Sequence, residues 1–532
     1  MAAATNIPVS PPTASVQPMA VDSGEFSQRI SSISHHSSVY FAGTILTTAA
    51  GYFFKIYLAR KLGAEALGLY ALGMTIIGFL GLFDSLGLPQ AAARFVSAYS
   101  ATREYERLGA FLRGSLVLLI GCNIVLGVGV LLAGPWLAVH FYHAPGLSPY
   151  LGAFALIMFL GVLTTFLGQV MAGYQDVARR TIFTHFIGTP ANIVLAVMLI
   201  GLGFGLAGYL AAQVASALLV LVLLVVAAWK MTPREARPAK PFVHIEKEVL
   251  TFSLASFGIA GLGFVLGQAD TIVLGHYLLA KQVGVYAVAM ALVGFVPIAL
   301  LSVNQIFSPI ISELHAAGNH TLLRELYAAL TKWILIVTFP LALTMAVFSR
   351  SLMGIFGPGF QAGAAVVAIG AVGQFFNCAV GSVGYLLLMS GNQFQLVKIQ
   401  AANAVLMIVL TVVLVPRLGI KGAAIAAAVT LVITNLWSLV SVSRRLKLFP
   451  YNSGYLKLAL PAFFSALAVF VLMRISGGMH SQWRIAGLAL VSAYAIFVGL
   501  ILAFGLDNAD RLMARMMWGR ISRIYTNHRG GK

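Results

Sequence analysis

Apolar stretches of about 18–25 residues recur along the whole chain, without the strict alternation of a β-strand. In lipid, only helices and closed barrels satisfy every backbone polar group, and these stretches have the length of helices. The pattern therefore predicts an all-α polytopic membrane protein with about fourteen transmembrane helices. The predicted spans are residues 38–60, 66–88, 110–133, 149–172, 181–203, 207–229, 249–271, 283–305, 328–349, 362–390, 394–415, 421–442, 455–475 and 484–505.

Composition supports a membrane protein over a soluble one. Hydrophobic residues make up 60% of the 532 residues and charged residues 9%, and the mean hydropathy is +0.92. A soluble domain carries roughly 25% charged residues, so this chain cannot build an adequate polar surface. The net charge of +19 would suggest nucleic acid in a soluble protein. Here the basic residues belong to loops, and no nucleic-acid partner is expected.

The order of the spans predicts six regions. They are a Pro- and Ser-rich disordered tail (1–37), an N-terminal lobe of six spans (38–229), a cytoplasmic linker (230–248), a C-terminal lobe of six spans (249–442), two further spans (443–505) and a basic amphipathic tail (506–532). The last tail is expected to lie on anionic headgroups or to recruit a glycan-assembly partner.

Basic residues orient the spans. With the N-terminus inside, about 25 of the 34 Lys and Arg residues lie on the cytoplasmic side, and the external loop at 134–148 has none. Both termini are therefore predicted to be cytoplasmic.

An internal repeat relates the two lobes. Residues 62–74 align with residues 278–290 at an offset of 216, which pairs Gly68 with Gly284 and Tyr70 with Tyr286. Residues 205–213 resemble 419–427. Since each unit holds an even number of helices, the lobes are parallel and related by an axis along the membrane normal. Two such lobes are typical of an alternating-access transporter.

Lys55 lies in the first predicted span, on one helical face with Thr44, Thr47 and Gly51. A charge inside the bilayer costs about 2.5–3.5 kcal/mol on insertion scales and calls for an explanation. Lys55 therefore either faces the bundle interior, where it can bind an anion, or extends to the nearby interface.

Asp270 ends a face of small residues on the seventh span. That face comprises Ser253, Ser256, Ala260, Gly263 and Gly267. Its carboxylate can bind H⁺ or Na⁺ for ion coupling, or form a salt bridge that latches the lobes together.

Further charged residues cluster near the predicted inner ends of the spans. The candidates for substrate pyrophosphate are Arg94, Arg113, Arg179, Arg180, His185 and Lys398, beside Lys55, and Asp84 is a second candidate for ion coupling or the latch. Guanidinium groups bind phosphate oxygens in a bidentate manner. The positive-inside rule alone also explains basic residues at these places.

No cofactor, metal site or catalytic group is expected. His140, Tyr142 and His143 lack the spacing on a rigid element that a zinc site needs, and we expect them at the surface. Cys122 and Cys378 lie inside apolar stretches, and no P-loop for ATP is present.

Several motifs resemble those of the polysaccharide or O-antigen flippases, a family of the multidrug/oligosaccharidyl-lipid/polysaccharide exporter superfamily. They run from Ala59 to Tyr70, from Gln268 to Gly275, from Val283 to Tyr286 and from Leu418 to Ala424. The resemblance covers roughly residues 36–505. It implies a V-shaped pair of lobes that moves an undecaprenyl-pyrophosphate-linked glycan across the bacterial inner membrane. A cationic cavity for the pyrophosphate is expected, and a monomer.

Three alternatives remain open. A multidrug or cation antiporter of the same superfamily would favour acids deep in the N-terminal lobe, where Asp84 is the one candidate, and usually has twelve helices. A membrane-embedded glycan polymerase or ligase would need a catalytic cluster outside the membrane, which the short external loops do not favour. A passive channel or scaffold is disfavoured by the two-lobe repeat.

Overall fold

The computed structural model describes residues 23–237, 247–475 and 482–504, and every regular element within them is helical. The α-helices are α1 (Ser23–Asp84), α2 (Leu88–Ala101), α3 (Tyr105–Trp136), α4 (Leu151–Gly173), α5 (Val177–Thr181), α6 (Thr189–Gly201), α7 (Gly205–Met231), α8 (Lys247–Tyr277), α9 (Ala280–Val293), α10 (Ile298–Ala316), α11 (His320–Val347), α12 (Ser349–Gly354), α13 (Ala364–Val380), α14 (Val383–Met389), α15 (Gln393–Leu418), α16 (Ile420–Leu446), α17 (Ala459–Ile475) and α18 (Gln482–Phe504). Two π-helical segments, η1 (Leu137–Phe141) and η3 (Ile182–Gly188), and 3₁₀ turns at Pro145–Tyr150, Arg234–Ala236, Pro358–Gly363 and Ser453–Leu458 complete the set.

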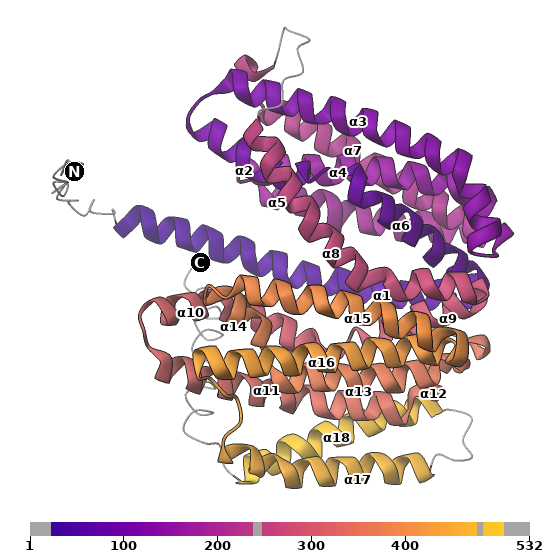
Figure 1. Cartoon of the computed structure of the whole chain (residues 1–532), viewed down its shortest axis with the longest axis vertical. Coiled ribbons are helices and arrows are strands. Elements are labelled where there is room, and N and C mark those ends of the chain that lie inside the picture. Colours follow the sequence, from indigo (N-terminus) through magenta and orange to yellow (C-terminus); the bar gives the residue numbers. More distant parts are fainter. Residues whose placement is uncertain (1–22, 238–246, 476–481, 505–532) are drawn as a thin grey trace, which may run out of the picture.

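The helices form two lobes (Figure 1). Helices α1 to α7 make up the N-lobe, and α8 to α16 make up the C-lobe. Helices α1 and α8 lie where the lobes face each other, and the lobes converge where the second half of α1 packs on α9. They diverge toward α2 and α10, which gives the V-shaped bundle that the sequence motifs implied.

Breaks in the helices occur where glycine or proline permits them. Gly63 interrupts α1 with φ of 78°, so this one element holds the first two predicted spans. The eighth predicted span bends by 52° between α9 and α10, before Pro297. The tenth breaks at Gly381, with φ of 72°, as its length and glycines suggested.

Eleven helices in the described parts of the chain are long and apolar enough to cross a membrane, or up to twelve if the bent pair counts as one span. An all-α multi-pass membrane protein is thereby confirmed, whereas the number fourteen stays a prediction. Residues 23–37 were assigned to the N-terminal tail from sequence and belong to α1 in the structure. Lengthening an existing helix is favourable because each added residue forms one further hydrogen bond. The predictions for 1–22, for 238–246 within the linker 230–248 and for 506–532 fall outside the described residues.

Apolar surface is distributed as a bilayer requires. Helix α4 lies inside the N-lobe against α2, α3 and α7, with Phe154 and Phe166 fully buried. Helix α3 instead exposes large side chains such as Val125 and Leu132, at 71% and 78%. Such surface is stable against lipid chains and not against water.

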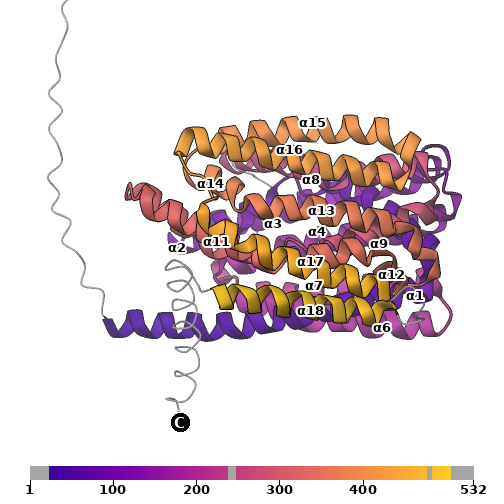
Figure 2. The same ribbon diagram turned by 90° about the horizontal axis from the view of Figure 1, so that it is seen from below.

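Helices α17 and α18 pack on each other and against α11, on the outer side of the C-lobe (Figure 2). Their contact uses small residues, with Ala489 and Ala493 fully buried. The Ser465 hydroxyl donates to the Ala493 carbonyl at 3.2 Å. These two helices extend the C-lobe without entering its interior.

Candidate functional site

The lobes meet at a reciprocal contact of two glycines. A Cβ at Gly68 would lie 1.7 Å from the Ala280 carbonyl oxygen, and a Cβ at Gly284 would lie 1.9 Å from that of Ala64. The offset of 216 that pairs Gly68 with Gly284 also pairs Ala64 with Ala280. Two segments related by a two-fold axis make contacts of this kind. Any side chain at either glycine would force α1 and α9 apart.

A second reciprocal pair flanks the glycines. The Arg60 Nε donates to the Ile355 carbonyl of the opposite lobe at 2.8 Å. His276, the residue that the same offset pairs with Arg60, places its Nδ1 2.9 Å from the Phe141 carbonyl. One basic side chain of each lobe therefore binds the backbone end of a helical segment in the other.

Tyr142 belongs to this contact and not to the surface, contrary to the prediction for the loop 134–148. It is 4% exposed, and a Cβ at Gly275 would lie 2.6 Å from its ring. Tyr142 directly follows η1, and its aromatic ring packs against Gly275 of α8, so it is buried where the lobes meet. Together with the glycine and Arg60/His276 contacts, Tyr142 closes this end of the molecule.

The N-lobe contains a cavity of about 470 Å³ between α1, α4, η3, α6 and α7. Lys55 lines it beside Phe54, opposite Thr184 and Asn192. The Lys55 ammonium lies 4.9 Å from the centre of the Tyr52 ring. Among the described residues Lys55 has no ion pair, so its charge is available to an anion.

Lys55 also lines a pocket of about 360 Å³ between the lobes, with Tyr52 and Phe356. The two spaces share Lys55, Leu58, Met74 and Tyr209. Lys55 therefore stands at the border between the N-lobe cavity and the interlobe pocket. Lys55 is exposed and lines both spaces, which is compatible with a lysine that faces the bundle interior, and the alternative of a lysine extending to the interface stays open.

A polar network braces the wall of these spaces. The Gln213 amide donates to the hydroxyls of Tyr70 and Tyr209, at 2.9 and 3.0 Å. Sequence reasoning named Tyr70 as a repeat position and missed its partner, although a glutamine inside a predicted span is itself a signal.

The C-lobe contains the larger cavity, about 560 Å³, with Asp270 at its wall. Asp270 is 8% exposed and accepts from the Tyr286 hydroxyl at 2.5 Å and from the Thr271 backbone N–H at 2.7 Å. Both partners belong to the C-lobe. In this conformation the carboxylate is thus held within one lobe and makes no salt bridge to the other among the described residues.

The remaining predicted residues do not line any of the three spaces. Arg94 and Arg179 are exposed, and Arg179 pairs with Asp176 at 3.1 Å. Arg113 and Arg180 are half-buried, and Arg113 binds its own helix at Gly109. His185 and Lys398 are exposed as well, and none of these six residues lines the N-lobe cavity, the C-lobe cavity or the pocket between the lobes. The side chains of Thr44, Thr47, Ser253, Ser256 and Ala260 lie outside the described set.

Asp84 ends α1 and is 7% exposed. Its backbone carbonyl accepts from the Asn123 amide at 3.1 Å, which ties α1 to α3. It lines none of the three spaces and lies far along α1 from Lys55, so the structure does not bring it together with Asp270 or Lys55.

One charged residue within a span was missed. Lys332 lies in the middle of α11 and is 6% exposed. The signal was visible, because a lysine 12 residues into a 28-residue apolar helix cannot easily extend to the interface. No group of three or more metal-binding side chains occurs in the described residues.

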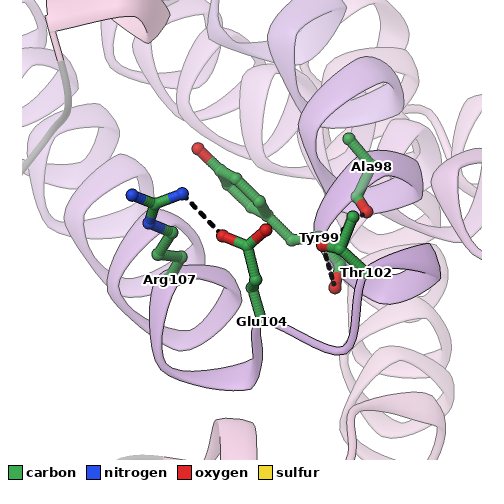
Figure 3. A network of polar contacts seen from close by, with 5 residues as sticks. All are labelled: Ala98, Tyr99, Thr102, Glu104 and Arg107. Carbon is green, nitrogen blue, oxygen red and sulfur yellow. Dashed lines mark hydrogen bonds and ion pairs between the residues drawn. The ribbon is translucent and has the colours of Figure 1, made fainter.

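The turn between α2 and α3 carries a surface network (Figure 3). The Arg107 guanidinium lies 2.6 Å from the Glu104 carboxylate, and Thr102 closes the end of α2 by donating to the Ala98 carbonyl. The Thr102 hydroxyl and the Arg107 guanidinium lower the pKa of Glu104. These residues fix the turn and stand apart from the cavities.

A sequence profile described as "Polysaccharide biosynthesis protein" matches residues 57–357. Among curated proteins, the membrane protein MJ1068 of Methanocaldococcus jannaschii is 21% identical over 88% of this chain and 94% of its own length. The probable low-salt glycan biosynthesis flippase Agl15 of Haloferax volcanii is 22% identical, over 71% and 77%. The succinoglycan biosynthesis transport protein ExoT of Rhizobium meliloti is 27% identical over 44% of each chain.

Solved structures share the fold. The lipid II flippase MurJ, in an inward closed conformation, superposes with a TM-score of 0.70 at 14% identity, covering 87% of this chain and 98% of that one. A multidrug resistance MATE family transporter in an inward-facing conformation gives a TM-score of 0.59 at 16% identity, over 74% and 94%. At these identities the likeness concerns the fold.

Proposed function

Because this chain belongs to the polysaccharide biosynthesis protein family, confirming the resemblance drawn from its motifs, we propose that it is a flippase for a lipid-linked oligosaccharide. The cargo would be a glycan on undecaprenyl pyrophosphate, moved by alternating access for polysaccharide, O-antigen or exopolysaccharide export. The similarity to Agl15, a probable glycan biosynthesis flippase, and to ExoT, a succinoglycan biosynthesis transport protein, supports this proposal.

The observation that carries the proposal is the position of Lys55. An ammonium group with no ion pair in the described structure, at the border of an open N-lobe cavity and an interlobe pocket, favours an anionic ligand. The pyrophosphate of a lipid-linked glycan is such a ligand. The sugar and the isoprenoid chain of that glycan require polar and apolar surfaces nearby. Other basic residues near the inner helix ends, such as Arg94, Arg113 and Arg180, line none of the spaces in this conformation. They would contact the pyrophosphate only in a conformation in which the lobes have moved.

Closure at one end supports the alternating-access step. The Gly68–Gly284 contact and its flanking hydrogen bonds seal the lobes beside Lys55, while the lobes diverge toward α2 and α10. Export requires this contact to open as the other end closes. Asp270, held by Tyr286 inside the C-lobe, is the group we propose for coupling to H⁺ or Na⁺.

The cellular location and the partners that we propose follow from the flippase function. We place the protein in the inner membrane of a bacterium, as a monomer with both termini in the cytoplasm, acting beside a glycan polymerase. Its own role is transport and not catalysis. A cation-coupled drug antiporter is the second candidate, and the buried carboxylate of Asp270 is the observation that favours it.

Deleting the gene and locating the lipid-linked glycan tests the choice. We expect undecaprenyl-linked repeat units to accumulate on the inner leaflet and the wild-type gene to restore export. Lys55→Ala should fail to do so at normal membrane expression, whereas Lys55→Arg should succeed. An unchanged glycan pool together with raised sensitivity to cationic drugs would establish the antiporter instead.

A further inference from the structure

The C-lobe cavity has an unusual lining for a space inside a membrane protein. Six side-chain amides face it, and no Lys or Arg occurs among the described residues that line it. The amides are Asn304, Gln374, Asn377, Gln400, Asn403 and Asn435. Hydroxyls of Thr430, Thr434 and Ser438 join them, and Asp270 is the one carboxylate. Such a surface is uncharged over most of its area and offers donors and acceptors together.

Part of this hydrogen-bonding capacity is unused. The Oδ1 atoms of Asn304 and Asn403 are buried and have no hydrogen-bond partner within the described structure, and Asn304 is only 6% exposed. Other amides are paired with each other, and the Asn377 side-chain amide donates to the side-chain oxygen Oε1 of Gln374 at 3.0 Å. A buried acceptor without a donor is costly, so the cavity favours a ligand that brings hydroxyl or N–H donors.

Phosphate does not fit this cavity, because it needs cations and the lining supplies none. A lipid chain does not fit either, since it would leave the amides unpaired. Sugar hydroxyls both donate and accept, as amides do, and the volume of about 560 Å³ lies within the range of small-ligand sites.

Ring contacts lead from Lys55 toward the wall of this cavity. The Lys55 ammonium stacks on Tyr52, and the Tyr52 ring lies 3.9 Å, centre to centre, from Phe295. Phe295 stands in the break between α9 and α10, and Val293 before the break and Leu300 after it both line the cavity. Two side-chain contacts therefore link the cationic group to the break between α9 and α10, and residues on both sides of that break line the amide-lined space.

We propose that the C-lobe cavity binds the sugar portion of the cargo through neutral amide–hydroxyl hydrogen bonds, while the pyrophosphate is held at Lys55. This rests on the proposed flippase function and adds a division of labour between the lobes. The N-lobe side recognises the charge common to all lipid-linked glycans. The C-lobe recognises the sugar and so determines which glycan is accepted.

Binding to the purified full-length protein in detergent separates the two contributions. The probes are farnesyl pyrophosphate and the same lipid carrying glucose, galactose or N-acetylglucosamine. We expect at least one sugar to tighten binding about tenfold over the sugar-free lipid, since several hydrogen bonds of modest strength add together. Asn304→Leu should reduce that gain to within about twofold and leave farnesyl pyrophosphate binding unchanged.

Matched variants complete the design. Gln400→Leu, at a half-buried position of the same cavity, answers the question if Asn304→Leu does not fold. Asn192→Leu removes an amide from the N-lobe cavity and should leave the sugar gain intact. Lys55→Ala should weaken all four lipids by the same factor.

Each outcome decides. No binding of any lipid to the wild type removes the flippase proposal itself. Binding of farnesyl pyrophosphate with no gain from any sugar, or a gain that survives Asn304→Leu and Gln400→Leu, overturns the inference alone. A Na⁺-dependent rise in melting temperature that Asn304→Leu abolishes, with no sugar effect, would make the cavity a cation site and overturn it as well.

Discussion

The cavities of the two lobes are built from corresponding positions and carry different chemistry. Gly51 and Gly267 line them at the offset of 216, as do Met74 and Met290. At an offset of 214, Ser216 corresponds to Thr430 and Val220 to Thr434, and all four are lining residues. The decisive difference is at two adjacent pairs of positions, where Phe54 corresponds to Asp270 and Lys55 corresponds to Thr271.

The comparison separates architecture from ligand choice. Small residues and methionines at equivalent positions leave an internal space in each lobe. The few polar positions that differ give one space a lysine and the other, among its described lining residues, six amides and a single acid. A two-lobe transporter can in this way hold chemically different parts of one substrate. The predictions below alter one side of the comparison at a time.

Making the N-lobe resemble the C-lobe should have the largest effect. Phe54→Asp places a carboxylate beside Lys55 and cancels the charge that attracts an anion, whereas Phe54→Leu keeps the position apolar. Since hydrogen bonds to charged groups contribute about 1.5–3 kcal/mol, we expect Phe54→Asp to lower farnesyl pyrophosphate affinity by about 10- to 100-fold. Equal affinities for the two variants would exclude Lys55 as the anion ligand.

Disrupting the contact between Gly68 and Gly284 should have the second-largest effect. Gly68→Ala and Gly284→Ala each push a Cβ into a carbonyl of the other lobe, at a cost of about 1–3 kcal/mol for overpacking. We expect either variant to open this end of the molecule. Spin labels at Glu65→Cys and Lys281→Cys, with Cys122 and Cys378 replaced, should report a longer distance.

Gly263→Ala is the control for this experiment, because a Cβ there meets nothing within 4 Å. It should leave the label distance unchanged. If the two interface variants also leave it unchanged, α1 and α9 do not separate where the glycines meet.

Neutralising the acid of the C-lobe should abolish ion coupling. Asp270→Asn keeps the size of the side chain and removes its charge, so transport into proteoliposomes should lose its dependence on a H⁺ or Na⁺ gradient, a decrease of about tenfold. Tyr286→Phe keeps the charge and removes one hydrogen bond, and we expect coupling with a changed pH dependence. Gradient-driven transport by Asp270→Asn at the wild-type rate would refute the coupling role.

The two flanking hydrogen bonds should have smaller and similar effects. Arg60→Gln and His276→Gln each remove or weaken one bond to the opposite lobe, and one such bond contributes about 0.5–1.5 kcal/mol. The population of the closed form, read from the same label pair, should fall by about two- to tenfold. A large effect from one variant and none from the other would show that the two contacts are not equivalent.

The smallest effect is expected outside the cavities, at Glu104. Thr102 and Arg107 lower the pKa of Glu104 in the folded protein, so the folded state binds fewer protons than the unfolded one. The stabilisation is present above the ordinary glutamate pKa and is lost as the pH falls below it. Melting temperatures should therefore fall slightly less on acidification for Glu104→Gln than for the wild type. Transport at neutral pH should not change.

Two of the nine site residues predicted from the sequence, Lys55 and Asp270, line cavities in the structure, and there is a physical reason why these two do. Lys55 and Asp270 interrupt long apolar stretches, and a charge there must face protein or water. The predicted arginines lie near helix ends, where topology and substrate binding leave the same pattern. The fold was easier to predict, because hydrophobic length and the need to satisfy backbone groups determine the helices directly.

Sequence reasoning could not find the groups that act through neighbours distant along the chain. The Gln213–Tyr70 bond, the Arg60 and His276 contacts and the burial of Tyr142 depend on segments more than 100 residues apart. Amides and hydroxyls are also inexpensive enough in a helix that none of them draws attention alone. Only their convergence on one cavity gives them meaning.

The sequence by itself determined that this chain spans a membrane with helices, and it singled out Lys55 and Asp270 as charges within predicted spans. These properties follow from local hydropathy and from spacing, which folding does not change. The tertiary structure decided which side chains share a cavity, which glycines allow the lobes to touch, and that the lobes differ in chemistry. Such relations depend on how helices pack, and packing brings together residues that no periodicity along the chain connects.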